Sequence, residues 1–416
     1  MYTEISSSKD PKKAIIPLLL VIAIDSMNFG FIFPILTPMF LSGANPILPV
    51  ETSLAMRDLL YGIVVAIFPL FMFFGAPILG DLSDYVGRKK VLLVCLLGTG
   101  LGYLVSGIGV SVNLFSLLVV GRIISGITAG SLPMAQAAIA DVSKDSKKQA
   151  KYMGMMMLAI AAGQVLGPTF AGFFSDIHIF SIFSNSLPFY LATGLTAVNI
   201  IWLLVAFRET HFVNKLKQLK FTKTLCSYKL VFTSTPLLII SLVFLCMQLS
   251  WSFYSQGSPA YLQAVFHYSN FNLGVFSAAL GVFIGISGTL IMPRLLNHIT
   301  TKQGAIIALL TMGIGTLIGI IQTSQILFWI GLVLNSSAAA LAFSFIITLF
   351  SRLADKGRQG WIMGITGAII AIAWAITALL TGLLIIYSTV LAGYLAVLFS
   401  FIGALFVSRF QERAIH

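Results

Sequence analysis

Long apolar segments recur along the whole chain, and they restrict its fold more than any other feature. A helix that crosses a bilayer needs about 20 apolar residues, and a chain of this length with short loops holds about twelve such segments. Hydrophobic residues make up 58% of the 416-residue sequence and charged residues only 9%, whereas an ordinary soluble domain carries about 25% charged residues. Such a chain cannot cover itself with polar surface, so lipid must be its solvent.

The apolar segments predict helices rather than strands. Lipid leaves helices and closed barrels as the only spanning structures, and these runs are long and do not alternate as barrel strands do. The first run, after Lys12 and Lys13, is too long for the core of a signal peptide and is interpreted as a span. The sequence predicts an all-α membrane protein with spans at residues 14–40, 59–80, 90–110, 113–140, 150–175, 186–207, 231–262, 271–296, 304–322, 325–351, 359–385 and 387–409.

The net charge of +12 has two interpretations, membrane topology or nucleic-acid binding, and the positions of the basic residues separate them. Among the loops that alternate with the basic ones, Arg57 is the only basic residue. This is the positive-inside pattern, so both termini are expected in the cytoplasm and nucleic acid is not expected as a partner. The basic clusters are Lys9, Lys12 and Lys13; Arg88, Lys89 and Lys90; Lys144, Lys147, Lys148 and Lys151; those of residues 208–229; Arg294 and Lys302; Arg352, Lys356 and Arg358; and Arg409 and Arg413.

The spans divide into two sets of six. Residues 1–207 are expected to form an N-terminal six-helix bundle and residues 231–416 a C-terminal one, joined by a basic cytoplasmic linker at 208–230. A lipid-headgroup or partner site is the less favoured interpretation of this linker. The spacing of Gly154 and Gly172 in the fifth span is repeated by Gly364 and Gly382 in the eleventh, which supports a duplication.

The segment between the second and third spans carries the strongest motif. Residues 80–90 read GDLSDYVGRKK. Gly80 and Gly87 permit a tight turn, Asp84 can accept from a helix N-terminus, and Arg88 beside Lys89 offers donors to a carboxylate or to helix-end carbonyls. The segment could hold the cytoplasmic ends of two bundles together in one state; a plain charged turn is the alternative.

Residues 80–90 resemble the signature loop of the major facilitator superfamily. Further segments resemble its tetracycline-efflux and drug:proton antiporter branch, and this resemblance covers most of residues 20–210. The resemblance implies two six-helix bundles, transport by alternating access, and no enzymatic activity. The segments are IDSMNFG at 24–30 with Pro34, YG at 61–62, APILG at 76–80, GRIISGIT at 121–128 and IAD at 139–141.

The fifth span contains a further glycine motif. Gly163, Gly167, Pro168 and Gly172 lie in GQVLGPTFAG at residues 163–172, where Pro168 removes a backbone donor and kinks the helix. The motif resembles the antiporter motif of exporters, with Ala171 in place of a usual glycine. The alternative is a kinked packing helix without a role in direction.

Two ionisable residues lie deep in predicted spans, and burial of such groups is costly enough to indicate function. Asp25 lies about eleven residues into the first span, near the bilayer midplane. Arg122 is the basic residue deep in the fourth span. We expect Asp25 to couple transport to protons and Arg122 to tune it, in line with the matching arginine of the family; a permanently paired structural role is the alternative for each.

The substrate cavity is expected between the two bundles near the midplane. Helix packing or the interfacial aromatic belt is an equally good interpretation of each single candidate. No metal-ligand spacing occurs among the three cysteines and five histidines, so no metal and no cofactor is expected. The candidates are Asn28, Phe29, Gln136, Gln164, Gln248, Trp251, Tyr254, Gln256, Asn335 and Trp374.

Together these features predict a monomeric antiporter of the bacterial inner membrane, which uses the proton gradient to export small amphipathic drug-like molecules. The alternatives are export of an endogenous metabolite such as a siderophore, and proton-coupled nutrient import. An enzyme or receptor would need a nucleophile–base pair, a metal motif or a soluble domain, and none is visible. The third span, with Gly98 to Tyr103, and the ninth lack the acids of tetracycline exporters, so tetracycline itself is not favoured.

Overall fold

The computed structural model describes residues 11–41, 47–49, 51–131, 134–135, 138, 146–207, 209, 235–295, 298–321, 324–352 and 359–410. Within these ranges every regular element is a helix. The predicted linker at 208–230 lies outside the described residues except for Glu209, so the predicted domain boundaries remain a prediction.

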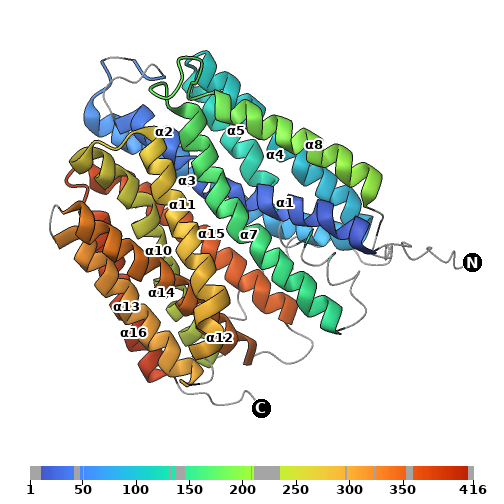
Figure 1. Ribbon diagram of the computed structural model, residues 1–416, viewed down its shortest axis with the longest axis vertical. Coiled ribbons are helices and arrows are strands. Elements are labelled where there is room, and N and C mark those ends of the chain that lie inside the picture. Colours follow the sequence, from blue (N-terminus) through green and yellow to red (C-terminus); the bar gives the residue numbers. More distant parts are fainter. Residues whose placement is uncertain are drawn as a thin grey trace, which may run out of the picture.

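The first set of helices corresponds to the N-terminal half of the chain. α1 packs against α7, α4 packs against both α5 and α8, and α3 packs against α5, as Figure 1 shows in blue to green. The bounds are α1 Pro11–Phe31, α2 Phe33–Leu41, α3 Leu54–Val86, α4 Arg88–Ser111, α5 Phe115–Ile127, α7 Ser146–Ser175 and α8 Leu187–Ala206.

The second set repeats this packing in the C-terminal half. α10 packs against α15 and α16, and α13 packs against α14 and α16. Two extensive helix–helix contacts join the sets, α7 with α11 and α3 with α15. The first of these lies at the centre of Figure 1. The bounds are α10 Thr235–Phe266, α11 Asn270–Ile286, a π-helix Ser287–Ile291, α12 Met292–Leu295, α13 Thr301–Ile321, α14 Gln325–Arg352, α15 Gln359–Ile385 and α16 Leu391–Arg409.

Ten of these helical stretches are long and apolar enough to cross a membrane. Two shorter apolar stretches, Ile15–Met27 and Phe115–Ile127, lie where the first and fourth spans are predicted. Large apolar side chains on α8 point outward: Val205 is 82% exposed and Ile201 62%. In water such a surface would be unstable, and in lipid it is the expected one. The all-helical membrane architecture is therefore confirmed, whereas twelve spans and cytoplasmic termini remain predictions.

Three predicted spans are interrupted. The first is broken at Ile32, between α1 and α2, because Pro34 lacks the backbone donor that would bond the Gly30 oxygen in a continuous helix. The eighth changes to a π-helix over Ser287–Ile291, which ends two residues before Pro293, and a proline in a helix commonly disturbs the hydrogen-bond ladder in this way.

The fourth predicted span, at 113–140, is interrupted after Ile127 by the non-helical residues 128–130. The C-terminal end of α5 packs closely between α3 and α4. The Ile127 backbone oxygen lies so close to Gly75 of α3 that a Cβ there would collide with it, and the Thr128 side chain occupies the equivalent space at Gly98 of α4. The Thr128 hydroxyl donates to the Ile124 oxygen at 2.8 Å, which satisfies one carbonyl at the helix end.

Candidate functional site

The signature segment, residues 80–90, turns at a single residue. The prediction that both glycines form the turn was wrong for Gly80, because α3 continues through it to Val86 and a Cβ at Gly80 would meet nothing. Gly87 has φ +103° and its backbone N–H donates to the Ser83 oxygen at 3.1 Å. This backbone conformation strongly favours glycine. The segment is therefore the end of one helix joined directly to the start of α4.

Glu209 is a site residue that sequence reasoning missed. Its carboxylate accepts from the backbone N–H of Arg88 at 2.9 Å and of Lys89 at 3.1 Å. These N–H groups open α4 and have no partner within their own helix, so a carboxylate there satisfies both and complements the helix dipole. Glu209 lies two residues after Phe207, the last apolar residue of the sixth span, and an acidic residue at a span end was the available signal.

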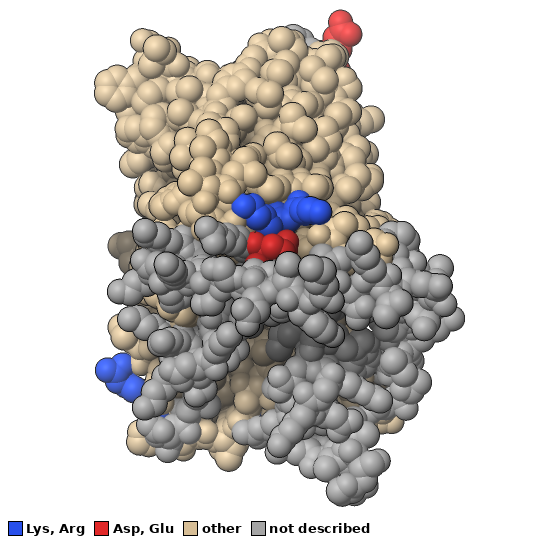
Figure 2. Space-filling model, turned by 90° about the vertical axis from the view of Figure 1, so that its right-hand side faces the viewer, with Lys and Arg blue, Asp and Glu red and all other residues tan. Residues whose placement is uncertain are grey.

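Lys89 ties the same helix start to the end of α8. Its Nζ donates to the Leu204 backbone oxygen at 2.9 Å. Figure 2 shows basic and acidic side chains meeting in the middle of one face that otherwise displays few charges among its described residues. The Asp84 side chain lies outside the description. The structure thus places Gly87, Arg88 and Lys89 together with Glu209, and the state-dependent contact predicted for this segment stays a prediction.

Asp25 and Arg122 come from different helices, α1 and α5. Arg122 is 6% exposed, and its guanidinium carbon lies 4.8 Å from the centre of the Phe68 ring. Such a cation–π contact retains part of the favourable interaction that a buried cation loses on leaving water. The Arg122 Nε atom has no hydrogen-bond partner among the described residues. Asp25 is half-buried. Its carboxylate is therefore partly accessible to solvent, whereas the Arg122 guanidinium is shielded from it.

Tyr103 is the second residue that sequence reasoning missed. It lies on α4 within electrostatic range of both Asp25 and Arg122, is 4% exposed, and packs its ring 5.5 Å from that of Phe31. From the sequence, the segment Gly98 to Tyr103 was notable only because it lacks an acidic residue. A tyrosine in an apolar span was the available signal, because a buried tyrosine hydroxyl usually finds a hydrogen-bond partner.

Close backbone packing sets the positions of these groups. A Cβ at Gly102 would lie 2.8 Å from the Gly121 oxygen, and one at Gly121 would lie 2.6 Å from the Gly102 oxygen. Tyr103 and Arg122 directly follow this pair, so the α4–α5 approach positions both. Phe31 contacts the Phe189 ring at 5.6 Å as well. The charged groups therefore lie beside an aromatic layer, where low polarity strengthens electrostatic interactions.

The antiporter-type motif on α7 faces two ways. A Cβ at Gly163 would collide with the Ala23 oxygen, and a Cβ at Gly167 would lie 2.9 Å from the Met27 Cα, so both glycines pack on α1 beside Asp25. Gly172 packs instead on α11 of the other half, and Pro168 packs on Gly30 at the break of the first span. The motif thus joins the half that holds Asp25 to the opposite half.

The predicted cavity residues do not all behave alike. Gln256 and Trp374 meet in a buried polar cluster between α10 and α15. Trp251 and Tyr254 form a ring pair at 6.4 Å, and Gln164 lies at the α7–α11 crossing beside Gly281. Gln248 is buried on α10.

Asn335 is bonded inside the C-terminal half. Its Nδ2 donates to the Met312 oxygen at 3.0 Å and to the Thr316 hydroxyl at 2.7 Å, which favours the packing interpretation for this residue. Gln136 lies outside the described residues, as do the side chains of Asn28 and Phe29.

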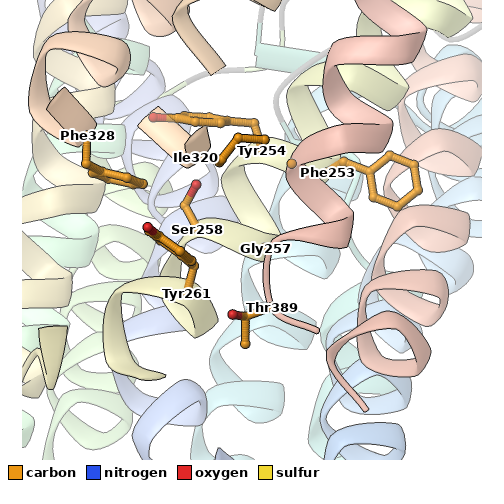
Figure 3. A pocket seen from close by; sticks show the side chains of 9 residues that line it. Phe253, Tyr254, Gly257, Ser258, Tyr261, Ile320, Phe328 and Thr389 are labelled. Carbon is orange, nitrogen blue, oxygen red and sulfur yellow. The ribbon is translucent and has the colours of Figure 1, made fainter. Parts of the chain in front are cut away.

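A small pocket lies among the helices of the C-terminal half (Figure 3). Of the predicted cavity residues only Tyr254 lines it, and it is far smaller than the pockets that hold drug-sized ligands. It is therefore not the predicted cavity between the halves. The lining residues are Phe253, Tyr254, Gly257, Ser258, Tyr261, Ile320, Phe328, Thr389 and Gly393.

Known transport and resistance proteins are similar to this chain in sequence and in fold. The chain is 34% identical over 199 residues to the class H tetracycline resistance protein of Pasteurella multocida, a match covering 48% of this chain and 45% of that one. It is 25% identical over 362 residues, 85% of both chains, to the class C protein of Escherichia coli. The fold matches the human organic anion transporter MFSD10 (TM-score 0.71, 19% identity, 97% and 100% of the chains) and a D-xylose-proton symporter (TM-score 0.75, 17% identity, 95% and 98%).

The fold and these relatives define a multi-pass membrane transporter. The family described as the Major Facilitator Superfamily matches residues 18–303, more than half of the chain. The chain belongs to this superfamily, in the branch of the tetracycline resistance proteins.

Proposed function

We propose that this transporter exports small amphipathic, drug-like molecules in exchange for protons. The observation that carries the proposal is the group of the half-buried Asp25 and the buried Tyr103 and Arg122 on α1, α4 and α5. Ionisable residues inside a membrane bundle are costly and mark proton or substrate pathways. The relatives named for tetracycline and quinolone resistance support export of drug-like compounds.

The proposed cycle uses Asp25 as the proton carrier. When the cavity opens to the side with more protons, the carboxylate takes one up and its attraction to Arg122 falls. When the cavity opens to the cytoplasm, the proton leaves. The negative charge of Asp25 is then restored, and the site can bind the next substrate. Tyr103 shares its surroundings with both residues, so its hydroxyl can respond to either charge state.

The signature segment acts at the cytoplasmic ends in this proposal. It holds the two halves together there while the cavity faces outward, with Glu209 and Gly87 fixing the start of α4. The proton gradient is the energy source and no cofactor takes part. We further propose twelve spans, cytoplasmic termini, residues 1–207 and 231–416 as the two bundles, a monomer, and the bacterial inner membrane.

Proton flux in inside-out vesicles tests the proposal. Wild type, Asp25→Asn and the control Asp58→Asn would be compared while lipophilic cations, antibiotics and siderophores are added. We expect substrate-dependent proton release in the wild type and the control, and its loss in Asp25→Asn. Equal transport in all three proteins would contradict proton coupling through Asp25.

The same vesicles separate the alternatives. Siderophore-dependent proton release with no response to drugs would favour a metabolite exporter. Movement of substrate and protons in the same direction would favour a nutrient importer. Either result would leave the fold and the family unchanged.

A further inference from the structure

A cluster of neutral polar groups lies where α10 meets α15. Ser252 Oγ and Thr377 Oγ1 are 2.5 Å apart, and Gln256 Nε2 donates to them at 2.5 Å and 3.2 Å. The same Nε2 donates to the Trp374 backbone oxygen at 3.3 Å. Ser252 and Thr377 are fully buried, and Gln256 is 1% exposed.

This cluster fixes the direction of the Gln256 amide. A backbone carbonyl can only accept, so the amide nitrogen must face Trp374. The Thr377 hydroxyl donates to the Ala373 oxygen at 2.8 Å, which leaves its lone pairs to accept from Gln256. The other amide atom, Oε1, is directed away and has no hydrogen-bond partner among the described residues. A buried acceptor in this position needs a donor.

The cluster lies close to the interface between the halves. On α15, Ala378 belongs to the apolar cluster that contains Phe31 and Tyr61 of the N-terminal half, and the Trp374 side chain packs against it. α10 also contacts α2. Substrate sites of such transporters lie between the halves. Gln256 is hydrogen-bonded to Trp374 and Thr377, which lie within one turn of Ala378 on α15.

We propose that Gln256 Oε1 accepts a hydrogen bond from an N–H or O–H group of the transported molecule. Ser252 and Thr377 are positioning residues that hold the amide in this orientation. The inference rests on the proposed export of drug-like molecules and adds a selection rule to it. A site with a buried acceptor discriminates strongly against an analogue that lacks the donor.

Two dyes of equal charge test this rule. Rhodamine 6G carries N–H on its aryl amines, and rhodamine B ethyl ester carries fully alkylated amines. Their binding to the purified full-length protein would be measured by fluorescence anisotropy. We expect wild type to prefer rhodamine 6G by about tenfold or more. Gln256→Leu should abolish this preference, and Thr377→Val, which keeps the side-chain volume, should reduce it.

Asn335→Leu is the matched control. Asn335 is also a buried amide with two hydrogen bonds from its nitrogen, and its oxygen has no partner in the described part of the chain. It joins α13 to α14, however, so its variant should keep the preference. Equal binding of both dyes by wild type, or a preference that survives in Gln256→Leu and in Thr377→Val, would overturn the inference. Failure of wild type to bind either dye would contradict the proposed substrate class and the inference with it, whereas proton coupling is tested separately by Asp25→Asn.

A second, independent observation concerns the opposite end of the interface. Asp176 follows α7 and is 4% exposed. Its Oδ2 accepts from the Phe271 backbone N–H at 3.2 Å, and its Oδ1 accepts from the His178 N–H at 3.0 Å. Phe271 lies in the first turn of α11, where a carboxylate is favoured by free N–H groups and by the helix dipole.

Asn270 makes the reciprocal contact. Its Nδ2 donates to the Ser175 backbone oxygen at 3.2 Å, to the Ser175 hydroxyl at 2.9 Å and to Asn185 Oδ1 at 3.1 Å. One turn into each helix, Gly172 and Gly274 are in backbone contact. The charge distribution places this end outside the cytoplasm. The two halves are therefore hydrogen-bonded to each other at their outer ends.

We infer that Asp176 and Asn270 form an outer latch, which holds α7 and α11 together in the state described and separates when the cavity opens outward. Water can replace these hydrogen bonds at the surface, so the latch can open without leaving buried groups unpaired. It would oppose the signature segment, which acts at the cytoplasmic ends.

A reversible disulfide tests the latch. The double variant Ser175→Cys, Asn270→Cys would be oxidised with copper phenanthroline in vesicles. We expect a cross-link that stops transport, with recovery after reduction, while each single variant continues to transport under oxidation. Transport that continues in the cross-linked protein would overturn the inference, and so would failure to cross-link, because the two side chains would then not be in contact.

Discussion

Gly172 of α7 and Gly382 of α15 make the same kind of contact in opposite halves of the molecule. A Cβ at Gly172 would lie 2.5 Å from the Asn270 oxygen and 2.9 Å from the Gly274 Cα. A Cβ at Gly382 would lie 2.7 Å from the Asp58 oxygen and 2.7 Å from the Gly62 Cα. In both cases the contacted residues are four apart on a helix of the other half. The second glycine of each pair that suggested a duplication therefore marks one of two equivalent crossings.

The halves also agree at the helix ends that are predicted to face the cytoplasm. Lys89, at the start of α4, donates to the Leu204 oxygen near the end of α8. Lys302, at the start of α13, donates to the Ser408 oxygen at 2.8 Å and to the Phe410 oxygen at 2.7 Å, at the end of α16. No sequence repeat of the signature segment is visible near Lys302, yet its lysine contact is repeated.

The chemistry of the halves differs. The N-terminal half holds Asp25 and Arg122 inside its helices, whereas the acidic residues of 231–416 are Asp355 and Glu412, outside the predicted spans. In their place the C-terminal half buries neutral amides, Gln256 and Asn335. The packing of the two halves is thus equivalent, whereas the charged groups deep in predicted spans, Asp25 and Arg122, belong to the N-terminal half alone.

Removal of the buried cation should have the largest effect. We expect Arg122→Leu to reduce proton-coupled transport by more than about tenfold, because the charge that opposes Asp25 is lost. Gln248→Leu, a buried polar residue of the C-terminal half, should reduce it far less. Vesicle proton flux measures both, and equal losses would break the proposed division of chemistry between the halves.

Bulk at the glycine crossings should come next. Gly172→Val and Gly382→Val should each destabilise the protein by about 1–3 kcal/mol through overpacking, and by similar amounts if the crossings are equivalent. Thermal unfolding in detergent measures this. Gly194→Val is the control, because a Cβ there meets nothing. A large effect at one crossing only would show that the two contacts are not equivalent.

Gly87→Ala should have an intermediate effect. The backbone conformation at φ +103° costs an ordinary residue about 1–2 kcal/mol, and the added Cβ would press on the Glu209 carboxylate. Thermal unfolding should show the loss, and Gly80→Ala should cause none. An unchanged melting temperature for Gly87→Ala would contradict the single-residue turn.

The lysine contacts should give the smallest effects. Lys89→Met and Lys302→Met should each lower the free energy of unfolding by about 0.3–1 kcal/mol, because a cation at a helix C-terminus is lost. The decrease should shrink at high salt, where the charge is screened. A decrease in one half alone would show that the lysine contacts are not equivalent, and only the glycine crossings would remain as a shared feature of the two halves.

Properties that depend on local composition could be predicted from the sequence. Apolar length and basic loops define the helical spans, and most observed helices begin and end within a few residues of the predicted ones. Asp25 and Arg122 stood out for the same reason, since an ionisable residue in an apolar run is unusual wherever it lies. The resemblance on the first half of the chain identified the family.

Contacts between distant segments were decided by the tertiary structure. Glu209 caps a helix that starts more than 100 positions earlier, and nothing local marks it as the partner of Arg88. The hydrogen bonds that orient Gln256 need Thr377 from another helix. Tyr103 lies within electrostatic range of Asp25 and Arg122 only because three helices bring these residues together. Hydrogen bonds and backbone approaches of this kind depend on how helices cross, and the spacing of apolar residues along one helix does not encode that crossing.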